Sequence, residues 1–150
     1  MTVKASTGMR NYLLETGPLR SALNLGFLKL YSGTAPATAD AALGSAGTNT
    51  LLCTISNNGT ATGLTFETNA VSGTIAKKST EVWAGTNAAT GLATFYRFVL
   101  TSDTGVSSTT EVRLQGTIDT IGADLNMASP NLVISAGQVI NTFVASIPAS

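Results

Sequence analysis

The chain of 150 residues contains no histidine and only one cysteine, Cys53. Without histidine it cannot build the usual Ser-His-Asp or Cys-His catalytic arrangements, and it lacks the commonest side-chain ligand for transition metals. One thiol can form neither an internal disulfide nor a cysteine-based zinc site. We therefore predict no enzyme activity, no metal and no cofactor, and we expect Cys53, which lies in an apolar alternation, to be a buried core residue.

Charge is also scarce. Only 11% of the residues are charged, and eight basic residues balance eight acidic ones, whereas about a quarter of a typical soluble domain is charged. Nucleic-acid binding requires a basic face, and the only adjacent basic pair is Lys77-Lys78, so no nucleic-acid partner is expected. A surface made of Thr, Ser, Asn, Gly and Ala can dock at modest desolvation cost, which favours assembly with other proteins over a module without partners.

Long apolar runs are missing as well. Charged and polar residues interrupt residues 1–26, so no secretion signal is predicted, and no segment has the length of a membrane span. We expect synthesis in a host cytoplasm and no membrane partner.

The remaining chemistry is sparse. A carboxylate-dependent hydrolase would need two of the scattered acids to face each other. Asp119 and Asp124 could be imagined as calcium ligands, but they lack the acidic spacing of an EF-hand loop, and a turn explains them better. Trp83, the only tryptophan, could serve a carbohydrate-binding or host-receptor module if it were exposed, although a core or interface position is commoner.

Residues 1–26 differ from the rest of the chain. Possible N-caps at Ser6 or Thr7 precede apolar residues at helical spacing, and Gly17-Pro18 separates two short helices. Two apolar stripes are predicted on them, formed by Met9, Tyr12, Leu13, Leu19, Ala22 and Leu23. We interpret residues 1–26 as a helical attachment segment that binds another chain. The alternative is that the two helices close one open end of the following domain.

From residue 27 the apolar pattern changes to period two, and about eight short strands are separated by Gly, Asn, Ser and Asp clusters. This pattern predicts a mainly β fold, an antiparallel β-sandwich of jelly-roll or immunoglobulin-like type covering residues 27–150. Asn57-Asn58-Gly59 is a hairpin signal, with Leu64 and Phe66 expected on the returning strand. Val112, Leu114 and Ile118 alternate with polar neighbours and are expected to point into the core.

Residues 92–100 form the longest strongly apolar stretch, with apolar residues on both faces and Arg97 interrupting one of them. Such a strand is either central or has one face against a partner. We interpret Phe95 and Val99 as contacts between copies of the chain. A homo-oligomer, most simply a trimer or a ring, is therefore expected.

Several short motifs carry a resemblance to a known group. Leu30-Tyr31-Ser32-Gly33-Thr34, Pro36 and Ala39-Asp40-Ala41, preceded by Arg10-Asn11 and Leu19 to Leu23 and followed by Gly122-Ala123-Asp124-Leu125, are the motifs concerned. They resemble small virion structural proteins of tailed bacteriophages. The resemblance implies a head decoration (cement) protein or a neck, collar or fibre-base component, located in the virion, with a major capsid or neck and portal-associated protein as partner. It transfers no catalytic residues.

Overall fold

The computed structural model describes residues 3–44 and 48–146, and it is mainly β with two short helices near the N-terminus. In chain order the elements are β1 (Lys4–Ala5), α1 (Thr7–Glu15), α2 (Leu19–Ala22), β2 (Phe27–Gly33), β3 (Asn49–Asn57), β4 (Thr74–Ala76), β5 (Trp83–Thr86), β6 (Gly91–Leu92), β7 (Phe95–Val99), β8 (Arg113–Asp119), β9 (Leu125–Asn126), β10 (Asn131–Leu132), β11 (Gly137–Ile140) and β12 (Val144–Ser146). The sequence pattern predicts a last strand with Val139, Phe143, Ala145 and Ile147, of which Ile147 lies outside the described residues.

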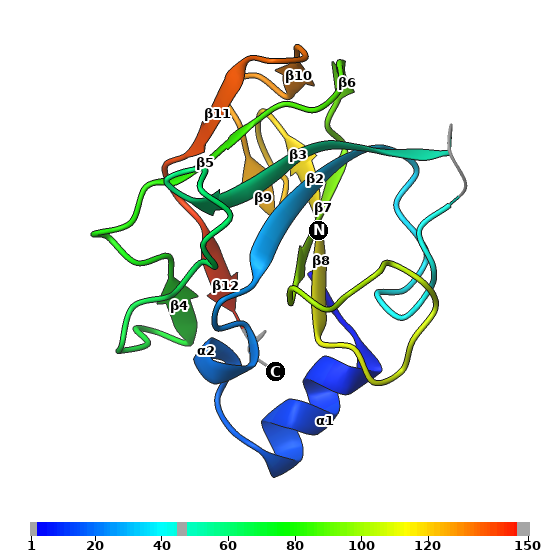
Figure 1. The fold of residues 1–150 in the computed structure, drawn as a ribbon. Helices are drawn as coiled ribbons and strands as arrows, with labels where there is room; N and C mark the ends of the chain where they lie inside the picture. Colours follow the sequence, from blue (N-terminus) through cyan, green and yellow to red (C-terminus); the bar gives the residue numbers. More distant parts are fainter. Residues whose placement is uncertain (1–2, 45–47, 147–150) are drawn as a thin grey trace.

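One eight-stranded sheet organises the domain, in the order β1-β8-β7-β2-β3-β5-β11, with β9 paired to β8. All pairs are antiparallel except the parallel pair β8–β9. Two small ribbons, β4/β12 and β6/β10, lie beside this sheet, and α1 and α2 lie at the end of the domain opposite β6 and β10 (Figure 1). The predicted mainly β, sandwich-like fold with two leading helices is confirmed.

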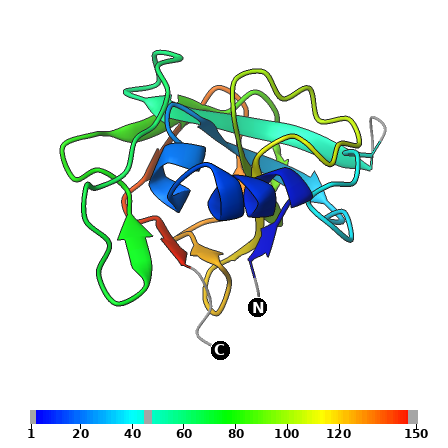
Figure 2. The ribbon, with the colours of Figure 1, turned by 90° about the horizontal axis from the view of Figure 1, so that it is seen from below.

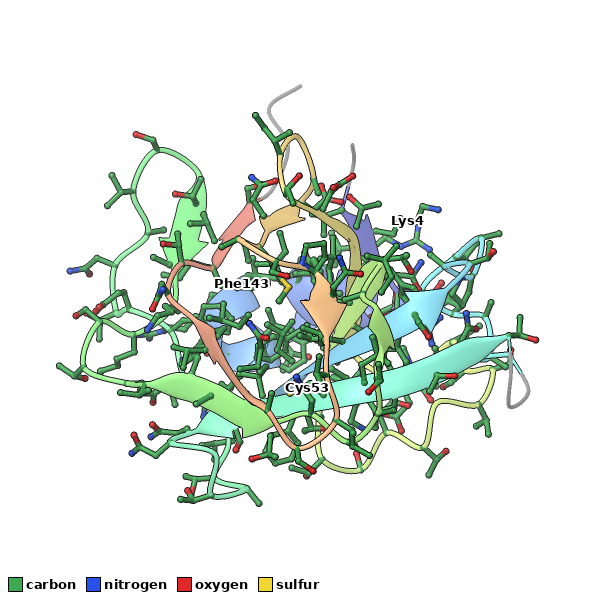
Figure 3. All side chains as sticks on the ribbon, turned by 90° about the horizontal axis from the view of Figure 1, so that it is seen from above. Lys4, Cys53 and Phe143 are labelled. Atoms are coloured by element: carbon green, nitrogen blue, oxygen red, sulfur yellow. The ribbon has the colours of Figure 1, made fainter. Side chains whose placement is uncertain are left out.

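Aromatic side chains from distant parts of the chain fill the space between the sheet and the ribbons (Figure 3). The ring of Phe66 lies edge-on to Trp83 with the centroids 5.4 Å apart, and the ring centroid of Phe143 lies 5.4 to 6.0 Å from those of Trp83, Phe98 and Tyr96. Tilted and edge-to-face pairs at such distances add to the stability that burial provides. The expected core positions of Val112, Leu114, Ile118 and Cys53 are confirmed by their burial.

The hairpin signal is confirmed as a turn. Asn58 and Gly59 both have positive φ, 55° and 67°, which is the backbone of a type I′ turn. The prediction for the returning strand was wrong, because β3 pairs with β2 and β5 instead. Leu64 and Phe66 are nevertheless buried, and they form single bridges with Gly26 and Lys77.

The alternation of apolar and polar residues suggested that β8 is half-buried, but both of its faces are buried. Val112, Leu114 and Ile118 face the aromatic core, but the charged and polar residues between them, Arg113 and Gln115, are just as buried. They lie on the second face of the sheet, which two other segments of the chain cover. The polar residues of β8 therefore do not mark a solvent-exposed face. They lie in a second buried layer, where Arg113 and Gln115 have hydrogen-bond partners.

Candidate assembly surfaces

The helical segment is built into the domain. The Oγ atom of Ser6 caps α1 by accepting from the Met9 N–H, accepts from the Arg113 N–H at 2.9 Å and donates to the carbonyl of Glu111. A Cβ atom added at Gly8 would lie 2.3 Å from the carbonyl oxygen of Thr110, so the helix backbone packs directly on the neighbouring segment. These contacts fasten α1 to the strand β8.

Met9 and Leu23 have no exposed surface and belong to the core cluster. Figure 2 shows both helices crossing one end of the domain, between β2 and β3 on one side and β9 and β12 on the other. In addition, β1 pairs with β8, with Lys4 opposite Gln115. The interpretation of Met9 and Leu23 as contacts to another chain is therefore corrected, since their side chains are already buried in cis. The alternative, in which the helices close the open end, fits the structure.

The other three helical residues, Tyr12, Leu13 and Leu19, are half-buried and pack against the core. Leu13 and Leu19 also line an open groove of about 530 Å³, whose opposite wall includes Ile75 and Ala145. Arg20 reaches across it, with its Nη1 atom 3.3 Å from the carbonyl of Thr68. Beyond Arg20 a more polar groove of about 350 Å³ continues to Lys78. The residues lining these two grooves include basic side chains but no acidic one.

Phe95 and Val99 lie on the second face of the sheet, and they are buried within this chain. Phe95 stacks on Tyr31 with the ring centroids 5.1 Å apart. Two covering segments, residues 34–44 and 100–111, lie over this face and are joined to each other by backbone hydrogen bonds from Leu43 to Gly105 and from Ser108 to Asp40. Of the two alternatives given for residues 92–100, a central strand and a strand with one face against a partner, the central strand is thus the correct one. Phe95 and Val99 are corrected from intermolecular contacts to intramolecular ones.

Polar side chains under the covering segments hold them in place. Arg113 donates to both carboxylate oxygens of Asp103 and to the carbonyl of Val106, and Gln115 donates to the carbonyl of Pro36. Lys4 reaches the carbonyl of Ala37 from β1 (Figure 3). This network was not predicted from the sequence. Its one visible signal was Arg97, a charged residue inside an otherwise apolar strand.

Several strands on one side of the domain carry no charged side chain. Residues 41–66, 82–96 and 125–150 contain no Asp, Glu, Lys or Arg, and the pairings bring their strands together. We call the strands β3, β5, β6, β10 and β11, together with residues 133–136 between β10 and β11, the uncharged end. Its most exposed apolar residues are Leu92 (50% exposed), Val133 (59%), Ile134 (56%) and Val139 (50%).

Leu92 and the pair Val133 and Ile134 lie close together at this end. The strand β6 pairs with β10, which places Leu92 opposite Asn131, and the Ile134 N–H donates to Thr90 Oγ1 at 2.9 Å. The uncharged stretches can be seen in the sequence, but only the strand pairing shows which of their strands lie together at this end.

The described residues offer little for catalysis or metal binding. They contain no group of three His, Cys, Asp or Glu side chains that could hold a metal ion. Asp124 accepts hydrogen bonds from the N–H and Oγ1 of Thr117, which supports the turn interpretation. Trp83 is fully buried and donates from Nε1 to Glu81, so it cannot form a sugar-binding platform. Within residues 3–44 and 48–146, neither helix has the length and apolarity needed to cross a membrane.

No protein-family model matches the chain, and neither a curated protein nor a solved structure is significantly similar to it.

Proposed function

We propose that this protein is a non-enzymatic structural subunit that assembles with its own copies through the uncharged end, and that it does so as a virion component of a tailed bacteriophage. A head decoration or neck and collar position is the one that the resemblance of its short motifs implies. The single observation that carries the assembly proposal is that five strands from three charge-free stretches form the uncharged end, with four exposed apolar residues at it.

A charge in a contact between copies loses its hydration unless the facing surface supplies an opposite charge, and in a two-fold contact it faces a like charge near the axis. A surface without charges avoids both costs. Burying the exposed parts of Leu92, Val133 and Ile134 adds a favourable contribution of about 25 cal/mol for each Å² removed from water. These terms support contact between copies at the uncharged end.

The helical end supplies a second place for contact. The groove beside Leu13 and Leu19 has apolar walls and basic side chains at Arg20 and Lys78. It suits an apolar segment of a neighbouring virion protein that also carries a carboxylate. Because the helices lie at the end opposite β6 and β10 (Figure 1), the subunit could bind its copies and a second protein at the same time.

Sedimentation velocity tests the contact between copies. We expect the protein to self-associate, and we expect Val133→Glu to shift it toward the monomer by placing charges in the interface. Val106→Glu is the matched control, because Val106 is similarly exposed at 61% but lies in a covering segment. A protein that stays monomeric at millimolar concentration, and makes no self-contact on particles, would contradict the proposal.

Particle binding is tested separately. We expect the protein, when labelled, to be found on purified phage particles, and Arg20→Glu to reduce its incorporation by reversing the charge of the groove. Glu15→Lys is the control, since it also changes a charge in the helical segment but does not line the groove. Equal incorporation of the two variants would count against the groove, and a label absent from particles against the virion assignment.

A further inference from the structure

The second face of the sheet places two cations directly opposite each other. In the register of β2, β7 and β8, Lys29 lies opposite Arg97, and Arg97 lies opposite Gln115. Like charges at directly opposed positions destabilise a sheet. Arg97 is also buried, so water screens its charge poorly, and Arg113 is a further cation close to it.

The hydrogen-bond partners of Arg97 are all neutral. Its Nε atom donates to Gln115 Oε1 at 2.8 Å, and Nη2 donates to the carbonyl of Ala41 at 2.8 Å. The Nη1 atom is buried and has no partner among the described residues. Residues 1–2, 45–47 and 147–150 contain no acidic side chain that could supply one. Among the described residues, this buried guanidinium thus has neither a full set of acceptors nor a paired carboxylate.

The nearest buried acid, Asp103, is already paired with Arg113. Asp103 Oδ1 accepts from Arg113 Nη2 and from the N–H of Gly105, and Oδ2 accepts from Arg113 Nε. Its charge is therefore neutralised mainly by Arg113. Burial, and secondarily the proximity of Arg113, lowers the pKa of Arg97 to about 10, so that Arg97 still carries its charge at neutral pH.

A small cavity of about 10 Å³ lies beside these groups, and Lys29, Tyr31, Arg97 and Asp103 are among the residues that line it. That volume corresponds to about one water-sized sphere. Burial raises the pKa of Tyr31 to about 12, so its hydroxyl remains a possible donor. The flexible side chain of Lys29 can give slightly more room.

We propose that this cavity binds one monatomic anion of the halide type, held between Lys29 and Arg97. A water molecule could fill the space, but it would leave the positive charges of Lys29, Arg97 and Arg113 balanced only by Asp103, whose carboxylate also lines the cavity. A halide ion accepts hydrogen bonds from N–H and O–H donors and also supplies the missing negative charge. The site would stabilise the sheet beneath the covering segments.

Two measurements on the intact chain test the site. In crystals grown with sodium bromide, we expect an anomalous peak in the cavity. In thermal unfolding at constant ionic strength, we expect chloride or bromide to raise the melting temperature relative to gluconate, which is too large to enter. The effect should saturate with halide concentration, as binding to the folded state requires.

Variants separate the site from general salt effects. Lys29→Gln should weaken the apparent chloride affinity several-fold, and Arg97→Met should abolish the halide effect if the variant folds. Lys4→Gln is the control, because Lys4 lies in the same cross-strand row but does not line the cavity. A bromide-free cavity together with equal stability in chloride and gluconate would overturn the proposal and leave a water molecule as the occupant. A halide effect unchanged in Lys29→Gln would likewise place the ion elsewhere.

Discussion

Arg113 binds both carboxylate oxygens of Asp103, with Nε 2.6 Å from Oδ2 and Nη2 2.8 Å from Oδ1, and both side chains are buried. The same guanidinium donates to the carbonyls of Ala39 and Val106. One side chain on β8 therefore holds both covering segments on the sheet. Such bidentate, charge-assisted pairs are among the stronger hydrogen bonds in proteins.

The first prediction concerns acid stability. Burial alone would raise the pKa of Asp103, but the hydrogen bonds from Arg113 and from the Gly105 N–H outweigh it and lower this pKa below its usual range. A depressed folded-state pKa stabilises the protein above the unfolded value, about 3.9 for Asp. We expect this contribution to be complete above about pH 5 and to be lost as the pH falls through the folded-state pKa.

Urea unfolding between pH 6 and pH 2 measures this effect, with Asp103→Asn as the comparison. At neutral pH the variant should be less stable by about 3–5 kcal/mol, because Arg113 is left as a buried charge without its partner. The difference from the unmodified protein should shrink as the pH falls and Asp103 takes up a proton. A difference that stays constant down to pH 2 would be inconsistent with the depressed pKa.

The second prediction concerns the core face of β8. Leu114 is only 4% exposed and packs in the core cluster. We expect Leu114→Ala to reduce the free energy of unfolding by about 2–5 kcal/mol, the range for a buried leucine. Leu14→Ala is the matched control, since Leu14 is 84% exposed, and it should change stability by no more than about 0.5 kcal/mol. Equal effects in a denaturant titration would show that the buried face is misassigned.

The third prediction concerns Gly116, which lies directly opposite Tyr96 in the β7–β8 register. A Cβ atom at Gly116 would lie 2.6 Å from the Tyr96 ring, and that ring is itself packed against Phe143. We expect Gly116→Ala to destabilise the protein by about 1–3 kcal/mol through overpacking.

Gly137→Ala is the control for this effect. Gly137 also lies in a strand, but its added Cβ would meet no atom within 4 Å and its φ is not positive. We expect Gly137→Ala to change the melting temperature little. If both variants unfold at the same temperature, close packing of Tyr96 over Gly116 does not restrict this position.

The fourth prediction concerns Cys53. Its thiol is buried in the core, and burial raises its pKa to about 11. Because the thiolate is the reactive form, we expect Cys53 to be nearly inert toward a disulfide reagent at pH 8 in the folded protein and to react fully in urea. The absorbance of the released reagent measures the rate. Rapid modification without denaturant would show that the core opens at this position.

The mainly β fold and the two leading helices could be predicted from the sequence because both depend on local patterns. Period-two apolar residues produced strands, Asn58-Gly59 produced a turn with two positive φ angles, and Ser6 capped the first helix. Strand order could not be predicted, because strands far apart in the chain pair through backbone atoms that every residue has. The pairing of β11 with β5 and of β1 with β8 is visible only in the folded chain.

The same distinction between local pattern and long-range packing applies to the candidate assembly residues. Apolar character marked Met9, Leu23, Phe95 and Val99 as residues that must be buried, and that was correct. Apolar character cannot show which chain buries them, because a side chain loses the same contact with water against its own domain as against a neighbour. The tertiary structure decided it, through the Ser6 and Gly8 contacts of α1 and through the two covering segments.

By itself, the sequence determined the low charge, the absence of histidine and the alternation of strands and turns, since these are properties of composition and neighbouring residues. Only the tertiary structure decided that strands from three charge-free stretches lie together at one end of the domain and that Arg97 and Arg113 lie beneath a second layer of chain. Both results depend on which distant segments come together. That choice is made by packing and by hydrogen bonds between residues as far apart as Asp40 and Arg113, which no short window of sequence contains.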